Sequence, residues 1–223
     1  MSTETTRDLD WDGCYNVRDL GALPLVGGGH TAPRRIVRAD NLDGLTSAGW
    51  AALAAYGVRT VIDLRNEQEC RQVERPEGID FVRVPFDAYA SADWIERWDP
   101  PGLPRNLAQY LADYPQAATD FGAAVAAAAP GTVVVHCAAG RDRTGLASML
   151  LLAHAGVQPE AILADYEHSM QRLLARWEAG APADDIARLD EAGRERIRTL
   201  TREFLAGLRP ERYLEDAVRS RLV

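Results

Sequence analysis

The chain has 223 residues, 47% of them hydrophobic and 26% charged, which suffices for one compact domain without a second core. Its formal net charge of -8 argues against nucleic acids as partners and against stable membrane association, because both surfaces are anionic. Residues 1–13 are acidic and hold no apolar stretch of signal-peptide length, and no later segment is long and uncharged enough to span a bilayer. We therefore expect a single cytoplasmic domain over residues 1–223, with residues 1–13 flexible.

The first regular elements that the sequence predicts are a helix and a strand. Thr46 is an N-cap residue before an apolar-periodic run, and Gly57 follows that run as a C-terminal glycine. Residues 58–64 are dense in β-branched apolar side chains, which is typical of a strand covered on both faces in a parallel sheet. Residues 81–86 repeat this pattern less completely.

The next segment, residues 87–104, mixes prolines, a glycine and tryptophans, a composition that breaks regular structure. Such a loop either forms a lid, with Trp94 and Trp98 closing over a site, or runs over the surface with its tryptophans packed on the core. Both interpretations stay open at this point. Residues 105–129 then have a largely helical pattern with a break near Pro115.

The second half of the chain begins with a short apolar strand at residues 132–136 and an apolar helix at residues 144–155 that Gly156 ends. Residues 159–223 then carry two sets of apolar side chains at helical spacing. The sets are Ile162, Tyr166, Met170, Leu173 and Trp177, then Ile186, Leu189, Ile197, Leu200, Phe204 and Leu208. Strands alternating with helices, followed by helices alone, predict an α/β fold with a central, mostly parallel sheet and a helical C-terminal layer.

The segment His-Cys-Ala-Ala-Gly-Arg-Asp-Arg-Thr-Gly, residues 136–145, lies where the buried strand gives way to the helix. Backbone N–H groups converge on an anion at such a position. Cys137 supplies a nucleophile there, Gly140 permits the tight turn, and Arg143 can return its guanidinium to two phosphate oxygens. The phosphate-binding residues would be Ala138, Ala139, Gly140, Arg141, Asp142 and Arg143.

Two further side chains support this loop in the prediction. The helix N-terminus and Arg143 favour the thiolate of Cys137, and Thr144 can donate a hydroxyl hydrogen bond to the sulfur. His136 is better placed to brace the loop than to transfer protons. The other cysteines, Cys14 and Cys70, lack this context and form no Cys-x-x-Cys pair, so we expect small, partly buried residues, no disulfide framework and no metal site.

Taken together, His-Cys-x-x-Gly-x-Asp-Arg-Thr-Gly resembles the signature of the protein tyrosine phosphatase superfamily, in its bacterial branch. Asn-Val-Arg-Asp-Leu-Gly at 16–21, Val-Arg-Ala-Asp at 37–40 and Val-Ile-Asp-Leu-Arg-Asn-Glu at 61–67 resemble further motifs of that branch. The resemblance implies a tyrosine phosphatase-like fold and hydrolysis of phosphate monoesters, protein phosphotyrosine first, through a phosphocysteine and without metal or cofactor. Its partners would be a phosphorylated protein or small phosphomonoester and the product, inorganic phosphate. Arg141 stands where the branch commonly has Lys.

A general acid must protonate the leaving oxygen. Asp87 follows the predicted strand at residues 81–86, on a loop expected at the same sheet edge as the phosphate site. It also resembles the general acid that follows a Pro-Phe pair in similar enzymes, and we take it as the first candidate. Asp142, inside the loop, is the second, although it can instead contact the substrate or stabilise Arg141. We expect structural roles for Asp63, in an ion pair or turn cap, and for Asp19, paired with Arg18.

Three alternatives remain beside a tyrosine phosphatase. The branch also resembles enzymes that act on phosphoserine, phosphothreonine or phosphoinositides, so a phosphoinositide or broad dual-specificity phosphatase is the second choice. A rhodanese-like sulfurtransferase also places a reactive cysteine between strand and helix, but its loop does not normally end in Arg-Thr-Gly. A catalytically dead phosphate-binding module would usually lack the cysteine or the arginine.

Overall fold

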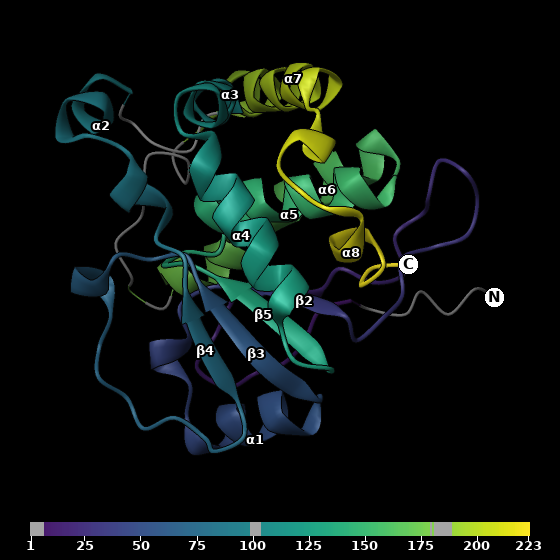
Figure 1. Cartoon of the computed structure of the whole chain (residues 1–223). Coiled ribbons are helices and arrows are strands. Elements are labelled where there is room, and N and C mark those ends of the chain that lie inside the picture. Colours follow the sequence, from purple (N-terminus) through teal and green to yellow (C-terminus); the bar gives the residue numbers. More distant parts are fainter. Residues whose placement is uncertain (1–6, 99–103, 179, 181–188) are drawn as a thin grey trace.

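The computed structural model describes residues 7–98, 104–178, 180 and 189–223 (Figure 1). The strands are β1 (Arg18–Asp19), β2 (Ile36–Ala39), β3 (Val58–Asp63), β4 (Asp80–Arg83) and β5 (Thr132–His136). The α-helices are α1 (Ser47–Ala55), α2 (Ala92–Trp98), α3 (Pro104–Asp113), α4 (Pro115–Ala127), α5 (Asp142–Ala155), α6 (Pro159–Glu178), α7 (Glu191–Gly207) and α8 (Asp216–Arg219). Single 3-10 turns are η1 (Leu42–Gly44), η2 (Glu67–Glu69), η3 (Phe86–Tyr89) and η5 (Pro210–Arg212).

The strands form one sheet in the order β1-β2-β5-β3-β4. β1 pairs with β2 in antiparallel orientation, and the other three pairings are parallel. The expected α/β fold with a mostly parallel sheet is therefore confirmed. Because β2, β3, β4 and β5 run in one direction, their carboxyl ends lie at the same edge of the sheet, which is where open α/β sheets bind ligands.

Alternate residues along the strands supply two hydrophobic clusters, one on each face of the sheet. Val133 and Val135 of β5 face the larger cluster, which includes side chains of α4, α5 and α7. Val134 faces the smaller cluster, to which α1 contributes Leu53 and the N-terminal segment contributes Trp11. Figure 1 shows α1 on the opposite side of the sheet from α4 and α5. The sheet is thus covered on both faces, as the apolar density of β3 predicts.

Most of the predicted elements occur where the sequence places them. The Thr46 hydroxyl accepts the Gly49 N–H and caps α1, and α5 ends at Gly156, which has φ 85°. Pro115 separates α3 from α4, as expected. β2 was missed, because it is only four residues long and carries the charged Arg38 in its centre. β4 ends at Arg83, short of the predicted residue 86.

The segment 87–104 is more regular than its composition indicates. It contains η3 and α2, so the prediction of irregular structure is wrong for these residues, while residues 99–103 lie outside the described part of the chain. Trp94 packs edge-on against Tyr110 and Tyr114 at centroid distances of 5.7 and 5.6 Å, and its Nε1–H donates to Asp113. Trp94 therefore packs on the core, and the side chain of Trp98 lies outside the description.

The N-terminal segment is also more ordered than expected from residue 7 onward. Trp11 is 2% exposed, and the Leu9 N–H donates to Val17 O. The prediction of flexibility is thus wrong for residues 7–13, whereas residues 1–6 lie outside the described residues.

The C-terminal part is helical as expected. Ile162, Tyr166 and Leu173 line the buried face of α6, and Ile197 and Phe204 line that of α7. The expected apolar position Ile186 lies outside the described residues. Across the described ranges no helix combines the length and the apolar character needed to cross a bilayer.

Candidate active site

The loop after β5 starts at Cys137, at the carboxyl edge of the sheet. Cys137 is 2% exposed, and its Sγ accepts the Gly140 N–H at 3.3 Å. Gly140 has φ +69°, and a Cβ at this position would lie 2.6 Å from Ala39 O at the end of β2. Glycine is therefore required both by the left-handed backbone and by the close approach of two main chains.

The first turn of α5 follows directly and carries Arg143. Its Nη1 and Nη2 lie 2.6 and 2.7 Å from the two carboxylate oxygens of Glu69, and Nη1 also lies 2.9 Å from Asp87. Burial lowers the pKa of Arg143, but Glu69, the sulfur of Cys137 and Asp87 outweigh burial and hold that pKa above its usual range. The guanidinium thus belongs to the same charged group as the predicted nucleophile and the predicted acid.

Asp87, in η3 after β4, contacts the Arg143 guanidinium from a different part of the chain. It follows Phe86, a fully buried anchor in η3, so the short connection after β4 fixes where its carboxylate points. Burial raises the pKa of Asp87; Arg143 opposes that shift, while Glu69 and Asp142 add to it. A carboxyl group with a raised pKa keeps its proton to higher pH, which is the property that a general acid needs.

The remaining loop charges pair with each other. The Nε and Nη2 of Arg141 each lie 2.9 Å from one carboxylate oxygen of Asp142. Of the two roles expected for Asp142 besides acid catalysis, the structure shows the contact with Arg141. Asp142 is partly exposed and also lies near Asp87, whose pKa it raises.

Thr144 differs from its expected arrangement. Its hydroxyl is fully buried and has no hydrogen-bond partner among the described residues, so the predicted bond to the Cys137 sulfur is absent. The sulfur accepts the Gly140 N–H instead. Thr144 still lies one residue after Arg143 in the first turn of α5.

His136 and Asp63 brace the loop from the ends of β5 and β3. The His136 Nδ1 lies 3.3 Å from Cys137 O, and its Nε2 lies 3.6 Å from Asp63. Burial lowers the pKa of His136 to about 4, so the ring is neutral at physiological pH. Asp63 accepts three hydrogen bonds from Arg65, two of them from its guanidinium, which outweigh burial and lower the pKa of Asp63 to about 2. The ion pair expected for Asp63 is present.

The expectation that Asp19 pairs with Arg18 is wrong. Asp19 accepts the backbone N–H groups of Gly21 and Arg34, so it caps a turn. Arg18 instead pairs with Asp165 on α6, at 2.9 Å from Nε to Oδ1. Neighbouring residues in an extended strand point to opposite faces, and this separates the two charges.

Sequence reasoning missed Glu69, Asn16, Arg38 and Asp165 as parts of the site. Asn16 and Arg38 stand in the motifs that carry the family resemblance, but no role followed from them. Glu69 closes a capping box with Asn66, whose N–H donates to its carboxylate at 2.9 Å, and that box was the available signal. Asp165 lies next to Tyr166 on the apolar side of α6, and a charge there was the second available signal.

Cys14 and Cys70 match their expected character as small, partly buried thiols. The Cys14 Sγ lies 3.4 Å from Asn41 O, and that of Cys70 lies 3.3 Å from Asn66 O. Burial raises the pKa of both thiols, and neighbouring carboxylates add to that shift. Neither is suited to nucleophilic attack at neutral pH.

Comparison with known proteins adds an independent finding. The sequence model of the tyrosine phosphatase family matches residues 9–219. A Cupriavidus necator protein with a tyrosine-protein phosphatase name is 32% identical over 180 residues, which are 77% of this chain and 66% of that protein. The tyrosine-protein phosphatase of Nostoc commune is 35% identical, over 69% of this chain and 53% of its own length. The triple specificity protein phosphatase PtpB of Mycobacterium tuberculosis is 29% identical, over 74% and 71%.

Proposed function

The chain belongs to the tyrosine phosphatase family, and on this premise we propose that it hydrolyses phosphate monoesters through a phosphocysteine intermediate on Cys137. One observation carries the proposal. A buried cysteine follows a parallel strand, and the arginine six positions later lies within 2.9 Å of a carboxylate whose pKa is raised. A nucleophile, a phosphate-binding cation and a proton donor are the three groups that this reaction needs.

In the first step the Cys137 thiolate attacks phosphorus, the S–P bond forms and the ester P–O bond breaks. The leaving oxygen takes the proton of Asp87, and the Arg143 guanidinium and the loop N–H groups hold the phosphoryl oxygens. In the second step Asp87, now a carboxylate, accepts a proton from water as the water attacks phosphorus. The S–P bond breaks, inorganic phosphate leaves, and the thiolate returns.

We propose protein phosphotyrosine as the substrate class. Two relatives carry a tyrosine-protein phosphatase name, and the family description agrees. Arg141, whose cation would favour an anionic phosphoinositide headgroup, is buried and paired with Asp142, so its charge is already compensated. The triple-specificity name of the mycobacterial relative keeps a broad-specificity phosphatase as the second candidate. The chain spans 66% and 53% of its first two relatives, so substrates of the whole proteins remain proposals here.

Replacement of Cys137 by Ser tests the covalent mechanism. Turnover of an aryl phosphate should fall by about ten-thousandfold or more, because the nucleophile is lost. Cys70→Ser, the same change at a thiol outside the loop, should hydrolyse the aryl phosphate at the wild-type rate. Mass spectrometry of acid-quenched enzyme should find phosphate on Cys137 in the wild type and in Cys70→Ser, and no phosphocysteine in Cys137→Ser. Normal turnover in Cys137→Ser would remove the mechanism.

The substrate class is tested by parallel assays on phosphotyrosine peptides, phosphoserine peptides and a soluble inositol phospholipid. Preference for phosphotyrosine supports the proposal, and dominant lipid turnover contradicts it. Thiosulfate-to-cyanide transfer above the phosphatase rate would instead indicate the sulfurtransferase. The cytoplasmic location and the single domain expected from the sequence stay predictions, which cell fractionation and limited proteolysis test.

A further inference from the structure

The three carbonyl oxygens of the loop between Cys137 and Arg141 are all held from outside the loop. Ala138 O accepts the Asn41 N–H at 3.1 Å and Arg176 Nη1 at 3.3 Å. Ala139 O and Gly140 O accept the same side-chain amide, the Nδ2 of Asn16, at 3.0 and 3.1 Å. Gly140 O also accepts Arg38 Nη2 at 2.8 Å.

The N–H groups of the same peptide units belong to Ala139, Gly140 and Arg141, the residues that follow the three carbonyls. The Gly140 N–H, which shares its peptide unit with Ala139 O, donates to the Cys137 sulfur at 3.3 Å. The Ala139 N–H, which shares its peptide unit with Ala138 O, has no hydrogen-bond partner among the described residues. Because the C=O and N–H of a peptide unit point in opposite directions, carbonyls held at the rear turn the N–H groups toward the sulfur. The rear hydrogen bonds therefore decide whether the loop presents donors or acceptors to an anion.

The orientation of the Asn16 amide is itself determined. Asn16 is fully buried, and its Oδ1 accepts Arg18 Nη1 at 2.6 Å. Arg18 has donors only, so the oxygen must face it, and the NH₂ group must face the loop. The Asn16 backbone is held as well, since its N–H donates to the Asp40 carboxylate at 3.0 Å.

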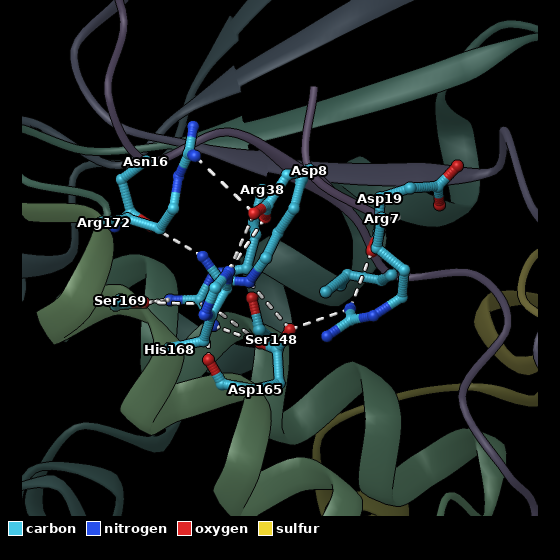
Figure 2. Close-up of polar contacts among 12 residues, drawn as sticks. Arg7, Asp8, Asn16, Asp19, Arg38, Ser148, Asp165, His168, Ser169 and Arg172 are labelled. Carbon is cyan, nitrogen blue, oxygen red and sulfur yellow. Dashed lines mark hydrogen bonds and ion pairs between the residues drawn. The ribbon is translucent and has the colours of Figure 1, made fainter. Parts of the chain in front are cut away.

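A carboxylate on α6 holds the arginines of this arrangement. Asp165 lies 2.9 Å from Arg18 Nε and 2.6 Å from Arg38 Nη1, and Ser169, one turn later, accepts a hydrogen bond from each arginine. Figure 2 shows Arg38, Asp165 and Ser169 pointing toward one another from β2 and α6. We call Asn16, Arg18, Arg38, Asp165 and Ser169 the rear network.

We propose that Asn16 is a positioning residue for the phosphate loop, an inference that rests on the proposed function. Its side-chain amide bonds two successive carbonyls and keeps both peptides from rotating. A rotated peptide would place a carbonyl oxygen against the phosphoryl group and the thiolate, where both charges repel it. Asn16 acts through the loop and does not touch the substrate.

Asn16→Asp tests this role, because it keeps the shape and the acceptor for Arg18 but replaces the NH₂ group by a carboxylate oxygen that faces Ala139 O and Gly140 O. We expect inorganic phosphate to bind about tenfold or more weakly in calorimetry. Alkylation of Cys137 by iodoacetamide below neutral pH should slow, and peptide mapping of Cys14 and Cys70 in the same samples supplies the reference.

Thr31→Val is the matched control. The Thr31 hydroxyl is also buried and also makes two hydrogen bonds to the main chain, to Leu20 O at 2.7 Å and from the Leu23 N–H at 3.0 Å, but neither partner belongs to the loop. We expect it to lower thermal stability as Asn16→Asp does, while phosphate affinity and Cys137 alkylation stay at wild-type values. Asn16→Asp with the phosphate affinity and alkylation rate of Thr31→Val would overturn the inference.

Asn16→Ala provides a second variant that adds no charge, should the aspartate prevent folding. It removes the two loop hydrogen bonds, so a folded Asn16→Ala with wild-type phosphate affinity also overturns the inference. The measurements separate this inference from the proposed function, since neither needs turnover. If the wild type hydrolyses no phosphomonoester but Asn16→Asp still weakens phosphate binding, the proposed function fails alone. If turnover is normal and both Asn16 variants bind phosphate as the wild type does, the positioning role fails alone.

Discussion

The two sides of the phosphate loop use the same residue types under opposite conditions. Behind the loop, Asp165 and its partners Arg18 and Arg38 are at most 1% exposed. In front of it, Glu69 and Asp87 pair with Arg143 at 32% and 41% exposure of their side chains. Charges without access to water must stay paired, whereas charges at a wet surface can exchange partners at small cost. The rear therefore keeps one arrangement, and the front is free to admit a ligand anion.

The pKa directions follow the same division. Burial alone would raise the pKa of Asp165, but Arg18, Arg38 and Arg7 outweigh it and hold that pKa far below its usual range. For Asp87, burial and the neighbouring carboxylates outweigh the single cation Arg143, and the pKa is raised. One carboxyl is thus a permanent anion of the scaffold, and the other is suited to give and take a proton.

The largest expected effect on stability lies at the rear. Asp165→Asn removes the charge that compensates several buried guanidinium groups, and the free energy of unfolding should fall by about 3–5 kcal/mol in urea denaturation. Because the pKa of Asp165 is depressed in the folded state, its contribution is present above the unfolded value of about 3.9 and lost as pH falls below it. The variant should therefore lose less stability than the wild type on acidification.

A control for this prediction lies on the same helix. Glu160 of α6 also pairs with an arginine, Arg202, but both side chains are exposed. Glu160→Gln should leave the unfolding transition unchanged. Equal losses of unfolding free energy in Asp165→Asn and Glu160→Gln would show that burial is not what makes the Asp165 ion pairs important for stability.

The next effect concerns activity at the front. Asp87→Asn should lower kcat by roughly a hundredfold, because the leaving oxygen loses its proton donor. Because the raised pKa keeps Asp87 protonated to higher pH than an exposed aspartate, the wild-type rate should fall as pH rises through that pKa. The variant should lack this falling limb in a pH–rate profile. A retained limb, together with collapse of activity in Asp142→Asn, would transfer the acid role to Asp142.

The smallest effect is expected for the front ion pair itself. Glu69→Gln breaks the ion pair with Arg143 but leaves both side chains in contact with water. The free energy of unfolding should therefore change by less than about 1 kcal/mol. Urea denaturation beside Asp165→Asn compares the more exposed Glu69–Arg143 pair with the buried carboxylate of Asp165 and its arginines. A loss of unfolding free energy as large as that of Asp165→Asn would contradict the difference drawn between the charges behind the phosphate loop and those in front of it.

The local features of the site followed from the sequence because they are contiguous in the chain. A strand of dense β-branched residues that ends at Cys137, a glycine turn, and an apolar helix that carries Arg143 in its first turn need only short-range geometry. Asp87 is distant from Cys137 in the chain, but it follows a strand whose carboxyl end is expected at the same sheet edge. For Cys137 and Arg143, residues that are close in the chain are also close in space.

The pairing of charges that lie far apart in the chain was decided by the tertiary structure alone. Asp165 lies 147 residues from Arg18, and Glu69 lies 74 residues from Arg143. With 33 acidic residues in the chain, no local pattern selects the one that meets a given arginine. Electrostatic energy depends on distance through space and on access to water, and both quantities exist only once the sheet has brought β2, β5 and α6 together.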